Sequence, residues 1–432
     1  MKKLLLSLFF TLSFGAWASH TLGGHSNVTQ LGQYTYLVEI TLYQETGGLP
    51  APPYVTYQLF KSNGGFYNLQ TTYQNGALQD TNFVYHNRLI SKFSDTITLT
   101  SPGDYRIVWT ECCRVTYTNM SGSNNAGMTF GTDFANYAVQ GSTAFVPNSP
   151  PAFVTIVPGK LITGVQNQFS VFAIDPDGDS ISYEYGDAKD LHLNSTFVPV
   201  APQSSLTTNF SQAGGGYSVT NYGIVTWSPS VNGKFGNSII VKEYRNGQMI
   251  GVNRLELTYN TMAGSTIPIT NLNNIIPAAG VWETTIYPPQ SWTASFDVPS
   301  NCSVELYGNE IKNLISVTNN SGSVSFSISN TSILEPGVYP IVVRVTNGSI
   351  ETDNLLFIYV TESNVGIEEK KIVNFYPNPV QNRLYVETPA ELITQVGVVK
   401  TLNAGWNDLS QLPNGIYYIY SDGVTNALLK ME

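Results

Sequence analysis

The stretch "AIDPDGDSISYEY" at residues 173–185 places three carboxylates within five residues, at Asp175, Asp177 and Asp179. Because the acids alternate with a proline and a glycine, one tight loop can direct all three side chains to a common point. Hard cations such as calcium prefer oxygen ligands gathered in this way, so the loop is a candidate calcium site. It is not an EF-hand loop, since Ser180 stands where the glycine would be. The alternative is a turn whose acids cap backbone amides and face water.

The three cysteines are the next candidates for chemistry: Cys112 and Cys113 are adjacent, and Cys302 lies far along the chain. Neighbouring residues on a strand have Cα atoms ~3.8 Å apart and point to opposite faces, so a Cys112–Cys113 disulfide would need a distorted turn. Buried thiols or this vicinal disulfide are favoured, and a bond to Cys302 is the further alternative. A catalytic thiol is disfavoured, because His86 is the only internal histidine of the same expected domain and no pattern pairs it with a thiol.

Familiar catalytic motifs are missing from the sequence, which contains no H-E-x-x-H, no G-x-S-x-G and no Walker loop. Paired carboxylates for glycoside hydrolysis are compatible with the sequence, since such partners can lie far apart along a chain. Trp227, Trp282 and Trp292 could line a sugar-binding platform, although most tryptophans of β-sandwiches lie in the core. The sequence therefore favours a binding protein over an enzyme.

The bulk composition of the 432-residue chain limits its partners and its fold class. The formal net charge is −10, which argues against nucleic-acid binding and against docking on anionic lipid. Only 12% of residues are charged, while aromatic residues also make up 12% and include 26 tyrosines. That balance suits half-buried strands better than surface helices, and the length predicts several domains.

The first 18 residues, "MKKLLLSLFFTLSFGAWA", have the organisation of a secretory signal peptide. Lys2 and Lys3 precede an apolar stretch at 4–14, and residues 16–18 supply a small-x-small cleavage site. The segment is too short to span a bilayer as a stable helix, and no other stretch approaches 18 apolar residues. We expect an exported protein that begins at Ser19 and has no transmembrane segment.

Alternation of apolar and polar residues with a period of two is common along the chain, and helical periodicity is scarce. One local pattern recurs at residues 103–105, 233–235, 337–339 and 415–417, where a glycine stands two residues before an aromatic residue that opens an apolar strand. The glycine permits φ > 0 at the turn, and the aromatic ring is expected to pack under the corner, as in β-sandwich domains. The spacing suits one copy in each domain.

These signals predict an all-β chain of tandem Ig-like or cadherin-like β-sandwich domains followed by a small β-sandwich. We expect domains at 19–148, 149–261 and 262–361, with the "DPDGD" loop in the second, and a last domain at 371–432. The polar, charged stretch at 362–370 is expected to be a linker.

The last sixty residues contain "VNFYPNPVQNRLYVE", then "DLSQLPNGIYYIYSDG" and a basic end, "LLKME". Together these stretches resemble the type A C-terminal sorting domain of the type IX secretion system of Bacteroidota. The matching positions are Tyr376, Pro377, Asn378, Pro379, Gly415, Tyr417 and Lys430. The resemblance implies that residues 371–432 address the protein to the type IX machinery and are then clipped off. The middle of the segment departs from the family pattern, because it lacks a strand that ends in an Asn-x-x-Gly turn.

The front of the chain contains "SHTLGGHSNVTQLGQYTYLVEITLYQE", "WTECCRVTYTNM", the "DPDGD" stretch and "VKEYRNGQMIGVNRLELTYN". These stretches are similar to an N-terminal region of large secreted surface proteins of the same bacteria. Related chains have a cysteine after the tyrosine of "TLYQE", where this chain has Gln44, so the resemblance implies that a disulfide partner for Cys112 or Cys113 is lost. It also implies a location outside the cell, secreted or on the outer-membrane surface, rather than an activity. We expect a binding protein that acts in adhesion on an unknown protein or glycan. A secreted glycan-binding or glycan-degrading protein is the alternative.

Overall fold

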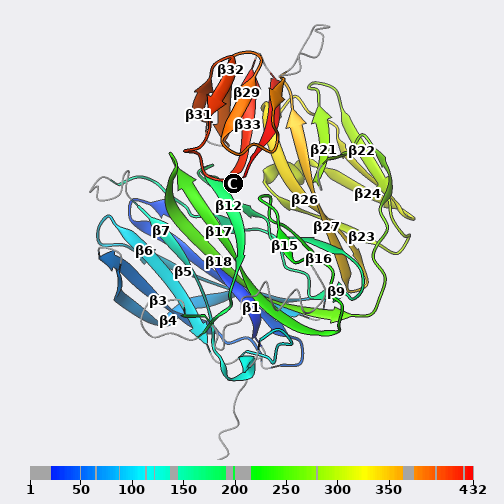
Figure 1. The fold of residues 1–432 in the computed structure, drawn as a ribbon. Helices are drawn as coiled ribbons and strands as arrows, with labels where there is room; N and C mark the ends of the chain where they lie inside the picture. Colours follow the sequence, from blue (N-terminus) through cyan, green and yellow to red (C-terminus); the bar gives the residue numbers. More distant parts are fainter. Residues whose placement is uncertain are drawn as a thin grey trace, which may run out of the picture.

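The computed structural model describes residues 21–431 except 49, 64–65, 87, 112–113, 121, 137–144, 191–197, 200–215, 279–280, 363–373, 395–396 and 422–423. This part of the chain is built from strands, with two short 3-10 helices at Ser123–Asn125 and Glu310–Leu314 (Figure 1). The expected all-β fold class is confirmed. None of the described helices is long and apolar enough to cross a membrane. The expected signal peptide at 1–18 lies outside the described residues.

The largest sheet has eleven strands, all from the described residues between 21 and 262. In sheet order they are β1 (Thr21–Gly32), β2 (Thr35–Glu45), β5 (Arg88–Thr98), β4 (Phe66–Tyr85), β3 (Tyr54–Asn63), β6 (Asp104–Glu111), β7 (Met128–Ala135), β18 (Gln248–Met262), β17 (Gly233–Arg245) and β12 (Ser180–Gly186), with β9 (Lys160–Ile162) beside β18. A further bridge between Gly24 and Glu256 joins β1 to β18 and closes part of the sheet into a ring. Gly23 permits this approach, since a Cβ atom there would lie 2.2 Å from the Glu256 carbonyl oxygen.

This sheet crosses the boundary that the sequence places at residues 148–149. Strand β18 of the second segment pairs with β7 of the first, for example Asn253 with Thr132. The core beneath it is shared as well, because Leu22 and Tyr43 of the first segment pack in one cluster with Trp227 of the second. The described residues between 21 and 262 therefore form one continuous structure. The sequence does not reveal this, because the pairing of distant strands depends on a register that a local pattern does not contain.

Three smaller pairings complete the second segment. They are β10 (Asn167–Ser170) with β16 (Ile224–Trp227) and β15 (Ser218–Val219), β8 (Ala152–Phe153) with β11 (Ala173–Ile174), and β13 (Lys189–Asp190) with β14 (Val198–Pro199). The β8–β11 pair fixes the entrance to the "DPDGD" loop, because β11 leads directly into the loop and β12 begins where the loop ends.

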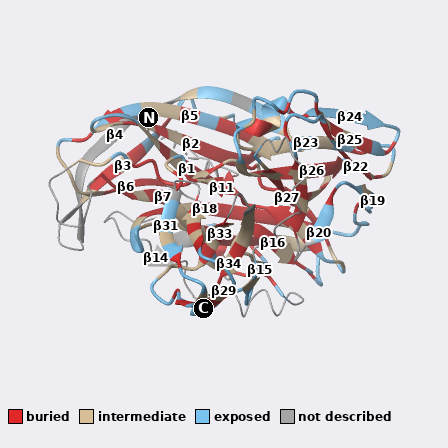
Figure 2. Ribbon diagram, turned by 90° about the horizontal axis from the view of Figure 1, so that it is seen from above, coloured by how far each residue is buried: buried red, intermediate tan, exposed pale blue. Residues whose placement is uncertain are grey.

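The third segment is a two-sheet sandwich with its own core. One sheet contains β19 (Thr270–Asn273), β22 (Trp292–Asp297), β25 (Ser323–Ile328) and β24 (Ser316–Asn320). The other contains β20 (Ile276–Ala278), β21 (Val281–Ile286), β27 (Ile350–Val360), β26 (Gly337–Asn347) and β23 (Ser303–Gly308). Figure 2 shows buried residues along β18 and β27 in the middle of the molecule and exposed residues along β24 at its edge.

The C-terminal segment is a second, smaller sandwich that sits over β12 and β17 in Figure 1. Its sheets contain β28 (Phe375–Tyr376), β29 (Arg383–Val386) and β32 (Gly405–Asp408), and β31 (Gly397–Leu402), β30 (Ala390–Thr394), β33 (Gly415–Ser421) and β34 (Val424–Lys430). Leu384, Leu392, Tyr417 and Ile419 are among the residues of its separate core.

The recurring glycine–aromatic pattern forms the corners that the sequence predicts. In the three copies whose aromatic residue is a tyrosine, the hydroxyl donates to a carbonyl four residues upstream; the copy at 233–235 has Phe235 instead. The bonds run from Tyr105 to Ser101 at 2.6 Å, from Tyr339 to Glu335 at 2.7 Å and from Tyr417 to Pro413 at 3.0 Å. The glycines differ from expectation, because only Gly103 has a positive φ, of 157°. At Gly415 the reason is close approach instead, since a Cβ atom would lie 3.0 Å from a backbone oxygen of β12.

A fully buried ion pair fastens the third segment to the second. The Arg344 guanidinium donates to both carboxylate oxygens of Asp353 at 2.7 and 2.8 Å, and neither side chain is exposed. The backbone N–H of Ser170 on β10 donates to the same Asp353 carboxylate at 2.7 Å. The Asp353 carboxylate thus accepts hydrogen bonds from Arg344 of the third segment and from Ser170 of the second, and in this way it links the two segments.

Replacing Asp353 with alanine should lower the free energy of unfolding by about 3–5 kcal/mol, because it leaves Arg344 buried with a broken pair. Glu184→Ala is the matched control, because it removes the half-exposed partner of Lys242 and should cost less than about 1 kcal/mol. Urea unfolding of the full chain measures both. Equal losses of unfolding free energy in the two variants would contradict the stabilising role of the Asp353 carboxylate.

Candidate metal centre

The "DPDGD" loop folds around the first of its acids. The Asp175 Oδ1 atom accepts hydrogen bonds from the backbone N–H groups of Asp177, at 3.1 Å, and Asp179, at 2.9 Å. A carboxylate that caps two amides of the following loop in this way fixes a tight turn between β11 and β12. The other oxygen, Oδ2, is buried and has no hydrogen-bond partner among the described residues.

The two remaining acids of the loop differ in their closest partners, although both face Arg245, whose Nη2 atom lies 3.9 Å from Asp177 Oδ2. Asp177 accepts a hydrogen bond from the backbone N–H of Ser149 and is only partly buried. Asp179 is 9% exposed and binds the guanidinium of Arg245 through Nε, at 3.0 Å, and through Nη2. The loop therefore does not gather its own three carboxylates at one point.

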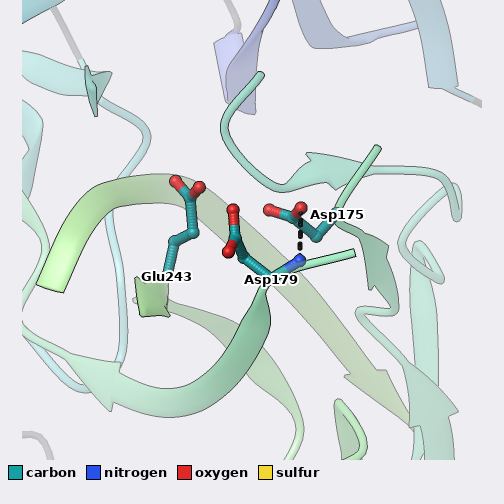
Figure 3. A group of neighbouring side chains, drawn as sticks. All are labelled: Asp175, Asp179 and Glu243. Carbon is teal, nitrogen blue, oxygen red and sulfur yellow. Dashed lines mark hydrogen bonds between the residues drawn. The ribbon is translucent and has the colours of Figure 1, made fainter. Parts of the chain in front are cut away.

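The third carboxylate of the cluster comes from Glu243 on β17, a residue that the sequence pattern did not single out. Ligand oxygens of Asp175, Asp179 and Glu243 all lie within 4.8 Å of one another, and the three side chains point toward a common centre (Figure 3). A signal existed in the alternation of β17, where Ile239, Val241 and Glu243 share the inward face and are each fully buried. An acid at a core position of a strand is a marker of function or of a buried network.

The protein makes room for Glu243 with a glycine on the neighbouring strand. A Cβ atom at Gly251 would lie 2.0 Å from Glu243 Oε2, so any larger residue would displace the carboxylate. Oε2 accepts a hydrogen bond from Asn148 at 3.3 Å. The second oxygen, Oε1, has no partner among the described residues, although the side chain is fully buried.

The cluster has more carboxyl groups than its surroundings could balance if all of them were ionised. Of the described cations, Arg245 alone contacts it, within hydrogen-bond distance of Asp179. Burial raises the pKa of Asp175 to about 8, with the charges of Asp179 and Asp177 adding to the shift. Burial also raises the pKa of Glu243 well above its ordinary value, helped by the charges of Asp175 and Asp179. A proton or a cation at the centre would remove the repulsion.

The available ligands are all oxygens, the donor set that hard cations such as calcium prefer. Asp175, Asp179 and Glu243 could each give one oxygen, and calcium would take its remaining ligands from water or backbone. Asp175 and Asp179 also line a cavity of about 50 Å³, whose lining includes Thr394, Ile416 and Tyr418 of the C-terminal segment. The centre therefore lies at a junction of segments.

The cysteines add no second centre to the described part of the chain. Cys302 is a free thiol, 6% exposed, in the core of the third segment, so the cross-domain disulfide considered from the sequence is absent. Cys112 and Cys113 lie outside the described residues, and their pairing stays a prediction.

The residues that match the sorting motif meet although they come from both ends of the C-terminal segment. Asn378 accepts from the Leu429 N–H at 2.8 Å and donates to the Ala427 carbonyl at 2.9 Å, which ties the first loop to β34. Lys430, at the end of β34, forms a bridge with Val380. Among the other motif positions, Gly415 opens β33, Tyr417 is buried in the core, and Tyr376, which precedes Pro377 and Pro379, is half-exposed.

Comparison with known proteins finds only solved structures with low sequence identity and low TM-scores to this chain. No known protein family and no curated protein matches the sequence. Solved structures that are similar include the N-terminal four Ig domains of Dscam1 isoform 4.4, with 10% identity, 88% of this chain and 92% of that chain covered and a TM-score of 0.18. An I-band fragment of titin has 9% identity, 79% and 98% coverage and a TM-score of 0.17. Extracellular domains 3–5 of Drosophila OTK have 9% identity, 79% and 97% coverage and a TM-score of 0.17. At these TM-scores the likeness supports no statement about individual residues or function.

Calcium should stabilise the chain more at pH 8 than at pH 5. The pKa of Asp175 is about 8 in the folded chain against an ordinary value of 3.8, so the folded state holds a proton that the unfolded state has lost between about pH 4 and 8. In a chelator, the stability from this group therefore falls as the pH rises through that window. Bound calcium would replace the proton, and at ten times its dissociation constant it would add about 1.4 kcal/mol. Melting curves at both pH values, with calcium or chelator, measure this.

The variants separate the cluster from the loop. Asp175→Asn and Glu243→Gln should each weaken the calcium response strongly, whereas Asp177→Asn, the matched control from the same loop, should keep most of it, because Asp177 adds charge near the centre but no ligand oxygen. Identical melting in calcium and chelator at pH 8 would argue for a plain turn, and loss of the response in Asp177→Asn would argue for a different ligand set.

Proposed function

We propose that this chain is a non-catalytic binding protein of the cell exterior, exported through the type IX secretion system and acting in adhesion. The observation that carries the proposal is the construction of the C-terminal segment, which has two sheets, a core of its own and motif residues that meet between its first loop and last strand. An address that machinery must recognise on many cargoes needs a fold independent of the rest, and a self-contained sandwich meets that need. The secretion machinery and an extracellular protein or glycan would be its partners.

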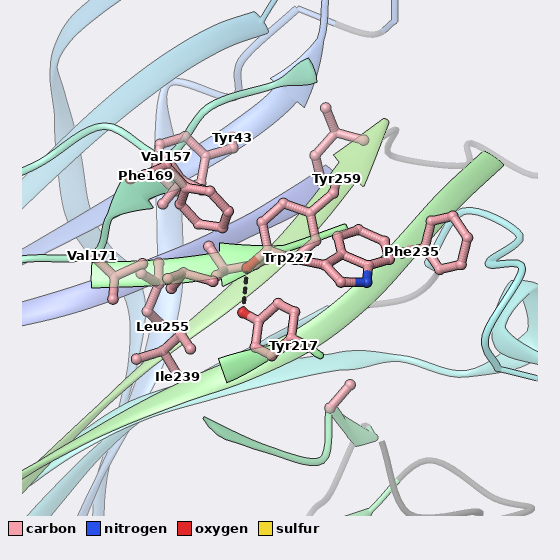
Figure 4. Close-up of a cluster of buried hydrophobic side chains, with 14 of the residues drawn as sticks. Tyr43, Val157, Phe169, Val171, Tyr217, Trp227, Phe235, Ile239, Leu255 and Tyr259 are labelled. Carbon is pink, nitrogen blue, oxygen red and sulfur yellow. Dashed lines mark hydrogen bonds between the residues drawn. The ribbon is translucent and has the colours of Figure 1, made fainter. Parts of the chain in front are cut away.

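The burial of the three candidate tryptophans argues against a sugar-stacking platform as the binding surface. Trp227 is 1% exposed and packs among Tyr217, Phe235 and Tyr259 (Figure 4). The other two candidates, Trp282 and Trp292, lie in the core of the third segment. None of the three can stack on a sugar without unfolding, which weakens the glycan-active alternative.

One exposed aromatic group does occur, on the outer face of the C-terminal segment. Tyr376, Tyr385 and Trp406 are register neighbours on β28, β29 and β32. The two tyrosine rings stack with centroids 4.8 Å apart, and the tryptophan ring meets Tyr385 at 71°. The rings cover one another and do not form a plane, so they do not resemble a flat glycan platform.

Calcium belongs to this proposal as a structural ion. Held by Asp175, Asp179 and Glu243, it would join the "DPDGD" loop to β17 and stiffen the junction below the C-terminal segment. Extracellular modules bind calcium with dissociation constants of about 10⁻⁴ to 10⁻³ M, so millimolar calcium outside the cell would occupy much of such a site.

The body surface under the C-terminal segment is the best candidate for the ligand-binding face. Ile416 of that segment packs with Phe172, Tyr222 and Phe357, which come from the second and third segments. Asn221 also donates to the Lys430 carbonyl at 3.3 Å. Removal of the tail after export would uncover these aromatic side chains beside the acid cluster, and an exposed apolar patch with polar neighbours is typical of an interaction site.

Deletion of residues 371–432 should leave the body folded and hold it in the periplasm, because the core of the C-terminal segment is separate and carries the proposed address. Fractionation and immunoblotting of a type IX-competent host measure the location, and circular dichroism of the purified chain measures the fold. The reciprocal control is a fluorescent protein that carries the signal peptide and residues 362–432, which should reach the outside. Normal export of the truncated chain, together with retention of the fusion, would overturn the proposed address.

A further inference from the structure

A second polar cavity, of about 150 Å³, lies at the seam between the first and second segments. The side chains that matter for its charge are Arg88, Lys160, His86 and Glu45, and Gly159 supplies part of its wall. A space of this size can hold several water molecules or a small organic acid. The cavity shares no lining residue with the acid cluster.

The feature that singles out this cavity is the state of Arg88. Its side chain is 3% exposed, and its Nη1 and Nη2 atoms donate to the carbonyls of Val157, at 3.0 Å, and Thr258. The Nε–H group has no partner among the described residues, and no described carboxylate lies within 4.0 Å of the guanidinium. Burial lowers the pKa of Arg88, although the charge of Glu351 opposes the shift. A buried cation without a paired anion is costly, so a counter-ion is expected.

The wall beside Arg88 Nε is made by a glycine. A Cβ atom at Gly159 would lie 2.9 Å from Nε, which any side chain would cover. Lys160, the next residue, is partly buried and donates to Ser349 Oγ at 3.0 Å, which leaves the ammonium further hydrogens to donate. Arg88 and Lys160 therefore bring two positive charges to one cavity.

The acids nearby do not pair with Arg88 directly. Glu45 pairs with Lys234. Glu351 lies 3.6 Å from both Arg344 and His86, and neither of its buried carboxylate oxygens has a hydrogen-bond partner among the described residues, so it acts on Arg88 only from beyond 4.0 Å. The local charge is thus positive in a chain whose net charge is −10. The few free donors and the presence of Glu45 suit a singly charged, two-oxygen anion better than a dianion such as sulfate, which would need more donors.

We propose that the cavity between Arg88 and Lys160 binds the carboxylate group of a small organic acid. The Arg88 Nε–H and the Lys160 ammonium would each donate to one carboxylate oxygen, which gives the buried Nε–H group a partner. The acid could be a sugar acid or the carboxyl end of a peptide, and both present the same group. This site is independent of the export route and of the calcium centre.

Saturation-transfer NMR on the full-length chain tests this directly with two probe pairs of matched size. Glucuronate is compared with glucose, and N-acetylglycine with its amide. We expect saturable binding of at least one acid at millimolar concentration or tighter and none of its neutral counterpart; the acid that binds identifies the source of the carboxylate. Absence of saturable binding by both acids would overturn the proposal, and so would equal displacement of the bound acid by chloride and sulfate at constant ionic strength.

Variants locate the binding. Lys160→Gln should raise the dissociation constant about tenfold, because it removes a charge-assisted hydrogen bond. Lys242→Gln, which removes an equal charge at the exposed pair with Glu184, should change it less than twofold. Gly159→Ala should abolish binding by covering Arg88 Nε, with melting curves recorded to establish that the chain is folded. Equal weakening by Lys160→Gln and Lys242→Gln would show a general charge effect and contradict the site.

Discussion

The pairing of strand β18 with its four neighbouring strands is the interaction on which the large sheet depends. It pairs with β17 along its whole length, with β7 over residues 251–253, with β9 in parallel at its end, and with β1 at Glu256. Through these pairings one strand near residue 255 holds elements that begin at residue 21. Its inward polar residues have partners across the seam: Thr132 donates to Asn253 Oδ1 at 3.3 Å, and Arg114 donates to Glu256 at 2.9 Å. The closed part of the sheet leaves few free strand edges, which protects it against pairing with other chains.

Charges buried at the seams divide into balanced and unbalanced groups. Arg344 with Asp353, and Arg114 with Glu256, are complete ion pairs, and such pairs add specificity to the way segments fit. The cluster of Asp175, Asp179 and Glu243 places three carboxyl groups beside one arginine, so protons or a cation must offset their charge, and Arg88 is a buried cation with no described carboxylate within 4.0 Å. A buried ion pair is accounted for by its role in the fold, whereas a buried charged group without a partner favours the binding of a ligand of opposite charge. Both candidate sites of this protein follow from that difference.

What the sequence predicts correctly is local. The alternation of strands and the tyrosine corners at Tyr105, Tyr339 and Tyr417 depend on residues a few positions apart, so the pattern contains the information. The site depends on distant partners: Arg245 reaches Asp179 from 66 positions away, and Asn148 reaches Glu243 from 95. These contacts are created by the register of β12 on β17, which places Ile181 opposite Glu243 and thereby turns the loop acids toward it. Spacing within the loop therefore favoured Asp177, while the register selected Glu243.

We infer that the described residues between 21 and 262 form one cooperative structure through β18, with both candidate ligand sites at its seams. Native-state hydrogen exchange of the full chain, read by mass spectrometry, measures this most directly. We expect amides in β7 and in β17 to become exposed in the same opening reaction, with free energies equal within about 1 kcal/mol. Exchange of β1 to β7 through a separate, less costly opening, while β17 and β18 stay protected, would contradict the claim and restore two independent domains.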